Sequence, residues 1–316
     1  MDSRILGTPL PLGRGAAVLT FDVGGDVTKA ALFDSDGQML GLSHTVCPTF
    51  NHDEGDTRLD QIEDLTTQFA RDFPQVTPAA VGLISAGLVD DCDGVAVLSS
   101  ALRWVNVPYR KLARDRLRLP SSFSHDGRAA GDAEFLLGAA RAYRNVVVIV
   151  IGPHISASII IDGVSHTGGG FAGKLGHSIV DPFGERCICG ARGCLETVAS
   201  VGAIVRRYRE ATGQPVTGAR DVLQRALHGD SAADVVWSDA VDAIALSISN
   251  LAAVLAPEAF VIGGGISLAG DEFFRPLRRR LDTLLSFHRR PVLLPAIVGE
   301  NAGLVGAALH ARAAVR

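Results

Sequence analysis

Three cysteines and one histidine form the group in this sequence that is best suited to bind a metal. Cys187, Cys189 and Cys194 lie in one short, glycine-containing stretch, and His177 precedes them. Three thiolates and an imidazole are a ligand set of tetrahedral structural zinc. Because protein atoms would fill all four positions, the metal would stabilise its loop and leave no position open for water or substrate. We therefore predict a structural zinc site, the alternative being three free thiols beside a surface histidine.

The spacing of the five cysteines argues against disulfide bonds. Cys187 and Cys189 are too close in sequence to be bridged without strain, and Cys47 and Cys92 lie far away in unrelated segments. Reduced thiols arranged as metal ligands suit a reducing compartment. The N-terminus lacks the apolar core of a signal peptide, and no stretch is long and apolar enough to cross a bilayer. We expect a cytoplasmic protein without membrane contact.

The composition indicates a globular protein with a large core. A chain of 316 residues with 47% hydrophobic residues is long enough for two domains. Its 30 basic and 34 acidic residues give a net charge of −4, which provides no general attraction to nucleic acid. The one basic run, from Arg103 to Arg118, is typical of the solvated face of a helix. We therefore predict no nucleic-acid partner.

The stretch around the cysteines resembles a known family signature. GHSIVDPFGERCICGARGCLE contains Gly-His followed by Cys-X-Cys-Gly-X-X-Gly-Cys-X-Glu. This is similar to the pattern of the ROK family of repressors, open reading frames and sugar kinases, which include glucokinases, fructokinases and N-acetylmannosamine kinases. The resemblance spans nearly the whole chain and implies ATP with Mg as cofactor, a sugar or polyol substrate and a homodimer. Only about fifteen residues precede the first predicted strand, too few for the DNA-binding domain of the repressors.

Two segments of the chain share one pattern of strands and turns. In AAVLTFDVGGDVTKAALFDSDGQML, an apolar run enters a glycine turn, a second apolar run leaves it, and Asp36-Gly37 follows. NVVVIVIGPHISASIIIDGVSH repeats this order and ends with Asp162-Gly163. Such a repeat predicts two related domains.

Together with the family resemblance, the repeat implies an α/β, two-domain actin-like ATPase fold, also called ribonuclease H-like, with a structural zinc loop at the rim of the cleft. We expect an N-terminal domain over residues 1–125, completed by a C-terminal helix over 302–316, and a C-terminal domain over 126–301. Apolar periodicity and end signals predict helices at 59–72, 109–118, 129–143, 201–211, 220–227, 232–255 and 302–314, and one ending at 280. Buried strands are predicted at 80–85 and 259–262.

The candidate catalytic residue is Asp126. Ser124-His125-Asp126 follows a predicted strand, opens a helix and lines up with the Asn-Asp pair of the family. The resemblance therefore implies that Asp126 is the base that takes the proton from the attacking hydroxyl. Considered alone, an aspartate at this point is an ordinary helix N-cap.

Glycine turns are the candidate sites for ATP. By resemblance, the turn of the first hairpin cradles the terminal phosphates with backbone amides, the matching turn of the second hairpin contributes one glycine, and a triple glycine after a buried strand lies on the adenosine side. These positions are Asp22, Gly24, Gly25, Gly152, Gly263, Gly264 and Gly265.

Four positions match the substrate contacts of the family: His125, Lys174, His177 and Glu196. In the family the histidine of the Gly-His motif both binds zinc and touches a sugar hydroxyl, so the metal loop would support one wall of the pocket. The alternative for Glu196 is a surface carboxylate or a first-turn helix residue.

Several predicted contacts depart from the family pattern. Asp26 replaces the threonine of the first phosphate turn and would bring a negative charge toward a polyphosphate unless magnesium bridges the two. In the second turn, Gly152-Pro153-His154 replaces Gly-Thr-Gly, and proline has no N–H to donate.

On the substrate side, Ala101 and His125 replace asparagines, and Lys174 replaces the glutamate that accepts from hydroxyl groups. These changes leave three hypotheses open. The chain is an ATP-dependent kinase of a sugar or sugar-like polyol, with Lys174 and His125 favouring an anionic or cyclitol-like acceptor. Alternatively, it is a catalytically impaired homologue that acts as a sugar-binding or regulatory protein, or it catalyses another reaction on the same fold.

Overall fold

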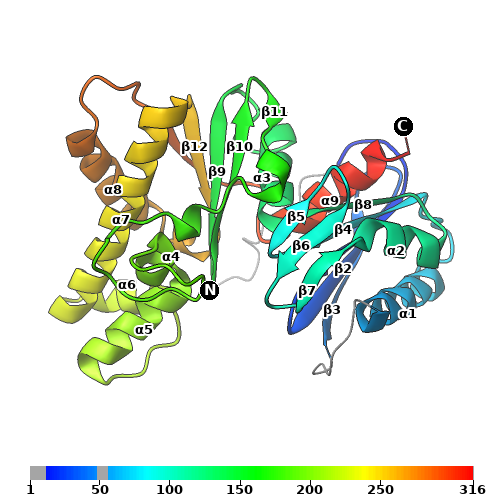
Figure 1. Ribbon diagram of the computed structural model, residues 1–316, viewed down its shortest axis with the longest axis horizontal. Helices are drawn as coiled ribbons and strands as arrows, with labels where there is room; N and C mark the ends of the chain where they lie inside the picture. Colours follow the sequence, from blue (N-terminus) through cyan, green and yellow to red (C-terminus); the bar gives the residue numbers. More distant parts are fainter. Residues whose placement is uncertain (1–11, 48–55, 316) are drawn as a thin grey trace. The chain divides into compact units, whose positions relative to one another are not determined.

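The computed structural model describes residues 12–47 and 56–315, which form two compact units (Figure 1). The first unit lies within Met1–Gly138, Ser165–Ala172 and Val298–Arg316, and the second comprises Ala139–Val164 and Gly173–Ile297. The C-terminal helix thus belongs to the first unit. The domain boundary predicted at residues 125 and 126 stays a prediction, and the helix that starts at Asp126 packs with the first unit.

The first unit contains a five-stranded mixed sheet of order β3-β2-β1-β4-β8. Its strands are β1 Val18–Val23, β2 Val27–Phe33, β3 Met39–Val46, β4 Ala80–Ser85 and β8 Ser121–His125. The hairpins β1-β2 and β2-β3 are antiparallel, whereas β1, β4 and β8 run parallel. The last residues of these three strands pair in register, so the turn after β1 and the start of the helix after β8 lie at the same edge of the sheet.

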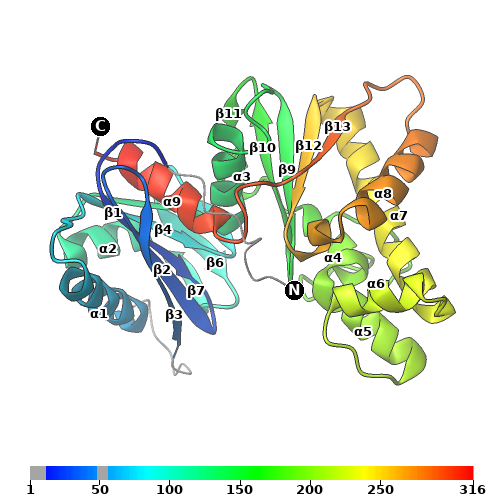
Figure 2. The ribbon, with the colours of Figure 1, turned by 180° about the vertical axis from the view of Figure 1, so that it is seen from behind.

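Helices cover both faces of this sheet (Figure 2). They are α1 Asp56–Asp72, α2 Tyr109–Leu117, α3 Asp126–Leu136 and α9 Ala302–Ala313. Helix α9 can pack closely on β4 because Gly82 has no side chain. A Cβ at this position would lie only 2.1 Å from the Ala307 carbonyl oxygen. It packs equally closely on α3, since a Cβ on Gly306 would lie 1.9 Å from the Ala129 carbonyl oxygen. Small residues therefore set the distance between these layers.

A three-stranded antiparallel sheet lies between β4 and α2 in sequence and was not predicted. It consists of β5 Leu88–Asp90, β6 Val95–Ser99 and β7 Trp104–Val107. The buried Trp104 ring lies 4.3 Å from that of Tyr109, which in turn lies 5.3 Å from Phe123 of β8. These aromatic contacts attach the small sheet to the core of the first unit.

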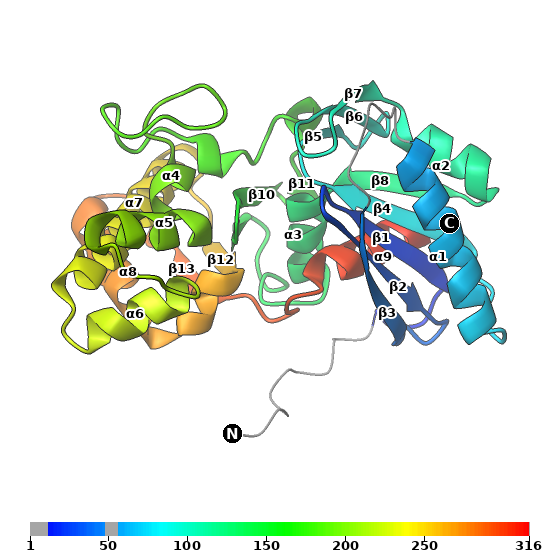
Figure 3. The ribbon, with the colours of Figure 1, turned by 90° about the horizontal axis from the view of Figure 1, so that it is seen from below.

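The second unit repeats the strand order of the first. Its sheet has the order β11-β10-β9-β12-β13, with β9-β10 antiparallel and β9, β12 and β13 parallel. The strands are β9 Val146–Ile151, β10 Ile155–Ile161, β11 Val164–Ser165, β12 Ala259–Gly263 and β13 Val292–Pro295. The two hairpins recognised as a repeat in the sequence therefore begin two sheets of the same topology, of which the strands of the first are labelled in Figure 3 and those of the second in Figure 2.

Five α-helices pack in the second unit: α4 Leu195–Ala199, α5 Val201–Thr212, α6 Ala219–Leu227, α7 Ser231–Leu255 and α8 Asp271–Leu284. Short 3₁₀ helices occur at η1 Gly168–Gly170 in the first unit and at η2 Leu175–His177 and η3 Gly265–Ala269 in the second. The prediction that no stretch is long and apolar enough to cross a bilayer was wrong for α7, which meets that criterion by length and composition. However, its Val236, Trp237 and Ile244 are buried in the core with β9 and β12. It is a core helix of this unit.

Two predicted helices differ from the observed ones. The helix predicted at 129–143 runs from Asp126 to Leu136, because His125 caps its start and Gly138 follows its end. The helix expected to end at residue 280 continues to Leu284 and is preceded by η3. The basic run from Arg103 to Arg118 contains α2, as the prediction of a helix there implies. On the surface of this helix, Arg116 forms ion pairs with Asp60 and Glu63 of α1.

Candidate functional site

The four predicted zinc ligands gather at one point of the second unit. One ligand atom from each of His177, Cys187, Cys189 and Cys194 lies within 4.8 Å of the others. Cys187 Sγ lies 3.6 Å from His177 Nδ1, and Cys189 Sγ lies 3.6 Å from Cys194 Sγ. Atoms bound to one tetrahedral zinc at the usual bond lengths are about 3.5–3.8 Å apart. The donor set and its spacing therefore fit zinc.

Backbone hydrogen bonds fold this loop. The Cys187 N–H donates to the Ala191 carbonyl over 2.8 Å, and the Gly190 N–H donates back to the Cys187 carbonyl over 3.0 Å. Gly193 has a φ of +69°, and a Cβ there would lie 1.4 Å from the Asp181 carbonyl oxygen. Only glycine fits this position.

The thiols of the cluster have unlike environments. Burial, together with the neighbouring sulfurs, raises the pKa of Cys194 to about 12, and burial also raises the pKa of Cys187. A hydrogen bond involving the Ala191 backbone lowers the pKa of the exposed Cys189. A bound cation would replace the thiol protons and stabilise all three thiolates.

Two carboxylates interact at the carboxyl edge of the first-unit sheet. Asp22 lies in β1, where the residue as a whole is half-buried but its carboxyl group is surrounded by protein, and Asp126 is the first residue of α3. Burial raises the pKa of Asp22 to about 7, the charge of Asp126 adds to the rise, and Lys29 opposes it. Paired carboxylates at the ends of parallel strands are suited to hold Mg²⁺, whose charge would favour ionised Asp22.

The N-cap of α3 is His125, not Asp126. His125 Nδ1 accepts a hydrogen bond from the Gly127 N–H over 3.1 Å, and the histidine is 5% exposed. The Asp126 side chain is 39% exposed, and its Oδ1 accepts from the same N–H over 2.6 Å. The cap position that the sequence offered as an alternative for Asp126 is therefore filled by its neighbour, and the role of His125 as a substrate contact stays a prediction.

The first predicted phosphate turn is tightly closed. The Gly24 N–H donates to the Val27 carbonyl over 3.2 Å, and a Cβ on Gly24 would lie 2.5 Å from that oxygen. A Cβ on Gly25 would lie 3.2 Å from the Ala101 carbonyl oxygen, so the predicted phosphate turn adjoins a predicted substrate position. Asp26, which differs from the threonine of the family pattern, is exposed.

Arg58, a buried residue of α1, was not predicted from the sequence to belong to the site. Its guanidinium donates a hydrogen bond to the Gly25 carbonyl. In a trans peptide the next N–H points away from that carbonyl, so Arg58 fixes the direction of the Asp26 amide. No local sequence signal links α1 to this turn, because the contact joins residues 33 positions apart.

The polar groups of the second predicted phosphate turn form hydrogen bonds within the protein. The Gly152 N–H donates to the His154 carbonyl over 2.9 Å, and Pro153 has no N–H. His154 Nδ1 lies 3.3 Å from Glu196 Oε1, and the Ile155 N–H donates to Glu196 Oε2 over 2.9 Å. The turn and the predicted substrate carboxylate are therefore directly joined.

Glu196 is a buried residue in the first turn of α4, not a surface carboxylate. Burial alone would raise its pKa, but the bonds with His154 and the Ile155 amide hold the pKa below its usual value. A Cβ on Gly176 would lie 2.9 Å from Glu196 Oε2, so Glu196 lies beside the Gly-His motif. Lys174 immediately precedes η2, which ends at His177.

The triple glycine ends β12. Gly264 has a φ of +82°, and a Cβ there would lie 2.2 Å from the Ile151 carbonyl oxygen, so the turn lies directly against the end of β9. Gly265 begins η3. The structure thus brings the predicted residues together in two sets. One set, in the first unit, is Asp22, Gly24, Gly25, His125 and Asp126, and the other, in the second unit, is Gly152, Lys174, His177, Glu196 and Gly263–Gly265 with the cysteines.

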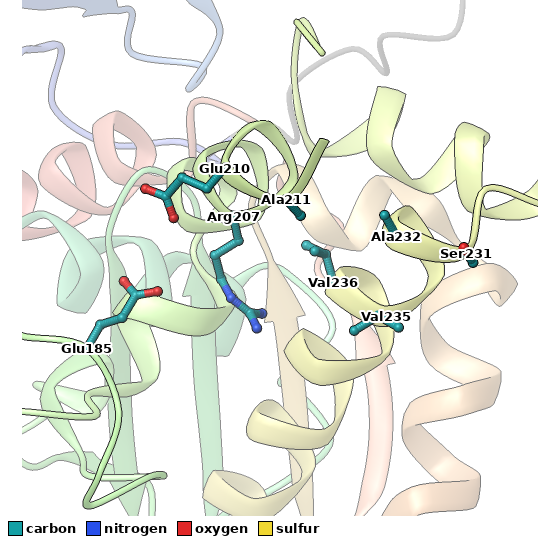
Figure 4. Close-up of a pocket in the computed structure, with 8 residues that line it drawn as sticks. All are labelled: Glu185, Arg207, Glu210, Ala211, Ser231, Ala232, Val235 and Val236. Carbon is teal, nitrogen blue, oxygen red and sulfur yellow. The ribbon is translucent and has the colours of Figure 1, made fainter. Parts of the chain in front are cut away.

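A separate open groove of about 580 Å³ lies in the second unit between α5 and the start of α7 (Figure 4). It is lined by Glu185, Arg207, Glu210, Ala211, Ser231, Ala232, Val235 and Val236. None of the predicted site residues, all of which the structure describes, is among them. The groove is not part of the predicted site.

The ROK family model matches residues 18–314. The chain belongs to the ROK family. Among curated relatives, a glucokinase of Thermotoga maritima is 30% identical over 309 residues, covering 91% of this chain and 94% of the relative. An N-acetylmannosamine kinase of Yersinia pseudotuberculosis is 29% identical over 306 residues, covering 96% of this chain and 100% of the relative.

Solved ROK structures share the fold over nearly the whole chain. A glucokinase of Streptomyces griseus, in complex with glucose and AMPPNP, superposes with a TM-score of 0.79 at 27% identity, covering 94% of this chain and 99% of that chain. A ROK transcriptional regulator, a homologue of the E. coli MLC protein, superposes with a TM-score of 0.84 at 26% identity. The superposition covers 95% of this chain and 78% of the regulator. The family therefore offers both a kinase and a regulator as relatives in structure.

Proposed function

We propose that this ROK protein is a carbohydrate kinase that transfers a phosphoryl group from ATP to a hydroxyl of a sugar or sugar-like polyol. The observation that carries the proposal is the pair Asp22 and Asp126 at one sheet edge, beside the Gly24-Gly25 turn. Asp126 is partly exposed and would take the proton of the attacking hydroxyl. Asp22 would hold Mg²⁺, which when bound neutralises the charge that develops on the phosphates.

In this proposal, the remaining predicted residues bind ATP or the acceptor. Gly24 and Gly25 would line the phosphate path, with the Gly24 N–H already bonded to the Val27 carbonyl within the turn, and Gly152 and Gly263–Gly265 would contribute to ATP binding from the second unit. His177 and Glu196 would orient the acceptor, with Lys174 and His125 as further contacts. Glucokinases and an N-acetylmannosamine kinase are among the relatives, so neutral hexoses and amino sugars belong in any substrate screen. Lys174 favours sugar acids and cyclitols as well.

The cysteine cluster would hold a structural zinc. Its four protein ligands leave no open position, and His177 Nδ1 faces Cys187 Sγ, so Nε2 remains for another partner. Reduced thiols and the soluble kinases of the family support a cytoplasmic location. Family membership supports a homodimer.

An ADP-release assay with ATP, Mg²⁺ and a panel of hexoses, amino sugars, sugar acids and cyclitols tests the kinase. We expect at least one acceptor to be phosphorylated, and Asp126→Asn to lower kcat by about 10²-fold or more while ATP still binds. Equal activity of Asp126→Asn would exclude Asp126 as the base. No turnover with any acceptor would count against the kinase.

A second candidate function is sugar binding or regulation without phosphoryl transfer. It is favoured by the β9-β10 turn, where the Gly152 N–H already has a partner and Pro153 cannot donate. The structural similarity to a ROK regulator also supports it. Thermal shift with ATP and Mg²⁺ separates the two candidates, because a nucleotide at 100 times its Kd stabilises a protein by about 2.7 kcal/mol. No shift at millimolar ATP would favour the second candidate.

A further inference from the structure

The carboxylate of Asp91 joins both sides of the turn that carries Asp126. Ser124, two residues before Asp126, donates its hydroxyl hydrogen to Asp91 Oδ2 over 2.9 Å. Arg128, two residues after it, donates to the same carboxylate from Nε over 3.1 Å and from Nη2 over 2.6 Å. A single side chain therefore holds both the end of β8 and the first turn of α3.

The guanidinium of Arg128 is held in a buried position. Its side chain is 1% exposed, and Nη2 also donates to the Val89 carbonyl over 2.6 Å. Nη1 is buried and has no hydrogen-bond partner among the described residues. Bidentate pairing of arginine with a carboxylate fixes the direction of both groups, and a buried guanidinium without its partner is an uncompensated charge. The pair is therefore a rigid connection.

The segment that carries Asp91 is itself fixed at several points. Asp90 Oδ1 accepts hydrogen bonds from the Cys92 and Asp93 amides over 3.0 and 3.2 Å. Arg110 of α2 donates to the carbonyls of Asp91 and Cys92 over 3.2 and 2.9 Å. The small sheet β5-β6-β7 thus supplies a firm support for the turn between β8 and α3.

We propose that Asp91, Ser124 and Arg128, which we call the Asp91 clamp, are positioning residues that fix the carboxylate of Asp126 for proton abstraction. The proposal rests on the kinase function proposed above. The Asp126 side chain is 39% exposed, so the backbone of its turn largely sets where the carboxylate lies. A displacement of about 1 Å at a reacting group can lower a rate by about 10²-fold. The clamp acts on this displacement.

The test uses two mild variants and a matched control. Ser124→Ala removes one arm of the clamp, and Arg128→Lys keeps the charge but cannot pair through two nitrogens. Asp132→Asn is the control, because it removes one carboxylate charge from the same helix α3, at a residue that contacts His310 of α9 over 2.8 Å, without touching the clamp. For each variant we measure kcat and KM for ATP and acceptor, together with hydrogen exchange of the amides of residues 124–130.

We expect both clamp variants to lower kcat by about tenfold or more, with each KM within about threefold, and to exchange residues 124–130 faster. The control should leave all three quantities near those of the parent protein. Unchanged exchange in both clamp variants would overturn the clamp, whether or not the protein is a kinase. Faster exchange with unchanged kcat would overturn the positioning role of the clamp. A parent protein without kinase activity would refute the proposed function, and hydrogen exchange would then decide whether Asp91 holds the turn.

Discussion

Asp22 makes the stability of the first unit depend on pH. Its pKa is raised from the ordinary value of 3.8 to about 7, chiefly because the carboxylate is buried and also because the charge of Asp126 acts on it. Between these two pH values the folded protein binds a proton that the unfolded chain has lost, so stability falls as pH rises through this window. The full difference of about three pKa units corresponds to about 4 kcal/mol, of which about 3 kcal/mol is lost between pH 5 and pH 8.

Asp22→Asn removes this dependence. We expect the variant to gain stability over the parent protein as pH rises from 5 to 8, by up to about 3 kcal/mol. The assay is urea unfolding without divalent cations, in a Trp237→Phe background, so that fluorescence reports only Trp104 of the first unit. Asp36→Asn is the control for the loss of one exposed negative charge.

Mg²⁺ provides a second arm of this experiment. At pH 8 it should stabilise the parent protein but not Asp22→Asn, because the cation favours the ionised carboxylate. The same dependence on pH in the parent and in Asp22→Asn would refute a raised pKa of Asp22. A parent protein that gains stability relative to the variant as pH rises would refute it equally.

Three other predictions concern the second unit. Protein purified without chelator should contain about one equivalent of zinc by elemental analysis, and Cys187→Ser should contain less than half; less than half in the parent would refute the four ligands. Gly193→Ala should lower Tm by several degrees more than Gly213→Ala, because both glycines have a φ of +69° but only the first Cβ would meet another atom. Replacing Pro153 by Thr and His154 by Gly should tighten ATP binding, measured by calorimetry, by about 10-fold for one restored amide contact to a charged phosphate; weaker or equal binding would contradict the importance of this turn.

The fold was predictable where the sequence carries long apolar runs between turn residues. The two hairpins ending in Asp36-Gly37 and Asp162-Gly163 correspond to two sheets of the same strand order. The strands β5, β6 and β7 were missed because they are short and have no long apolar run, and their burial comes from the contact of Trp104 with Tyr109. Tertiary packing, not local pattern, makes these residues strands.

The predicted metal ligands converge, since all four lie in one local loop. The residues that support the predicted base were not predictable in this way. Asp91 and Arg128 are 37 positions apart, and a carboxylate after a short strand reads as an ordinary turn residue. The capping role of His125 was also missed, because histidine is not among the residues favoured at an N-cap.

The departures from the family pattern fall on both units, and the contacts that they leave in each unit bear on the choice between the two functions. In the second unit, the Gly152 amide and His154 are engaged with the turn itself and with Glu196. In the first unit, Asp22 and Asp126 keep their place at the strand ends. Loss of phosphoryl transfer alone would remove the need for a carboxylate as costly to bury as Asp22, because an uncharged residue would be more stable there at neutral pH. The retained acidic pair therefore favours a kinase with altered nucleotide contacts over a binding protein that has lost its chemistry.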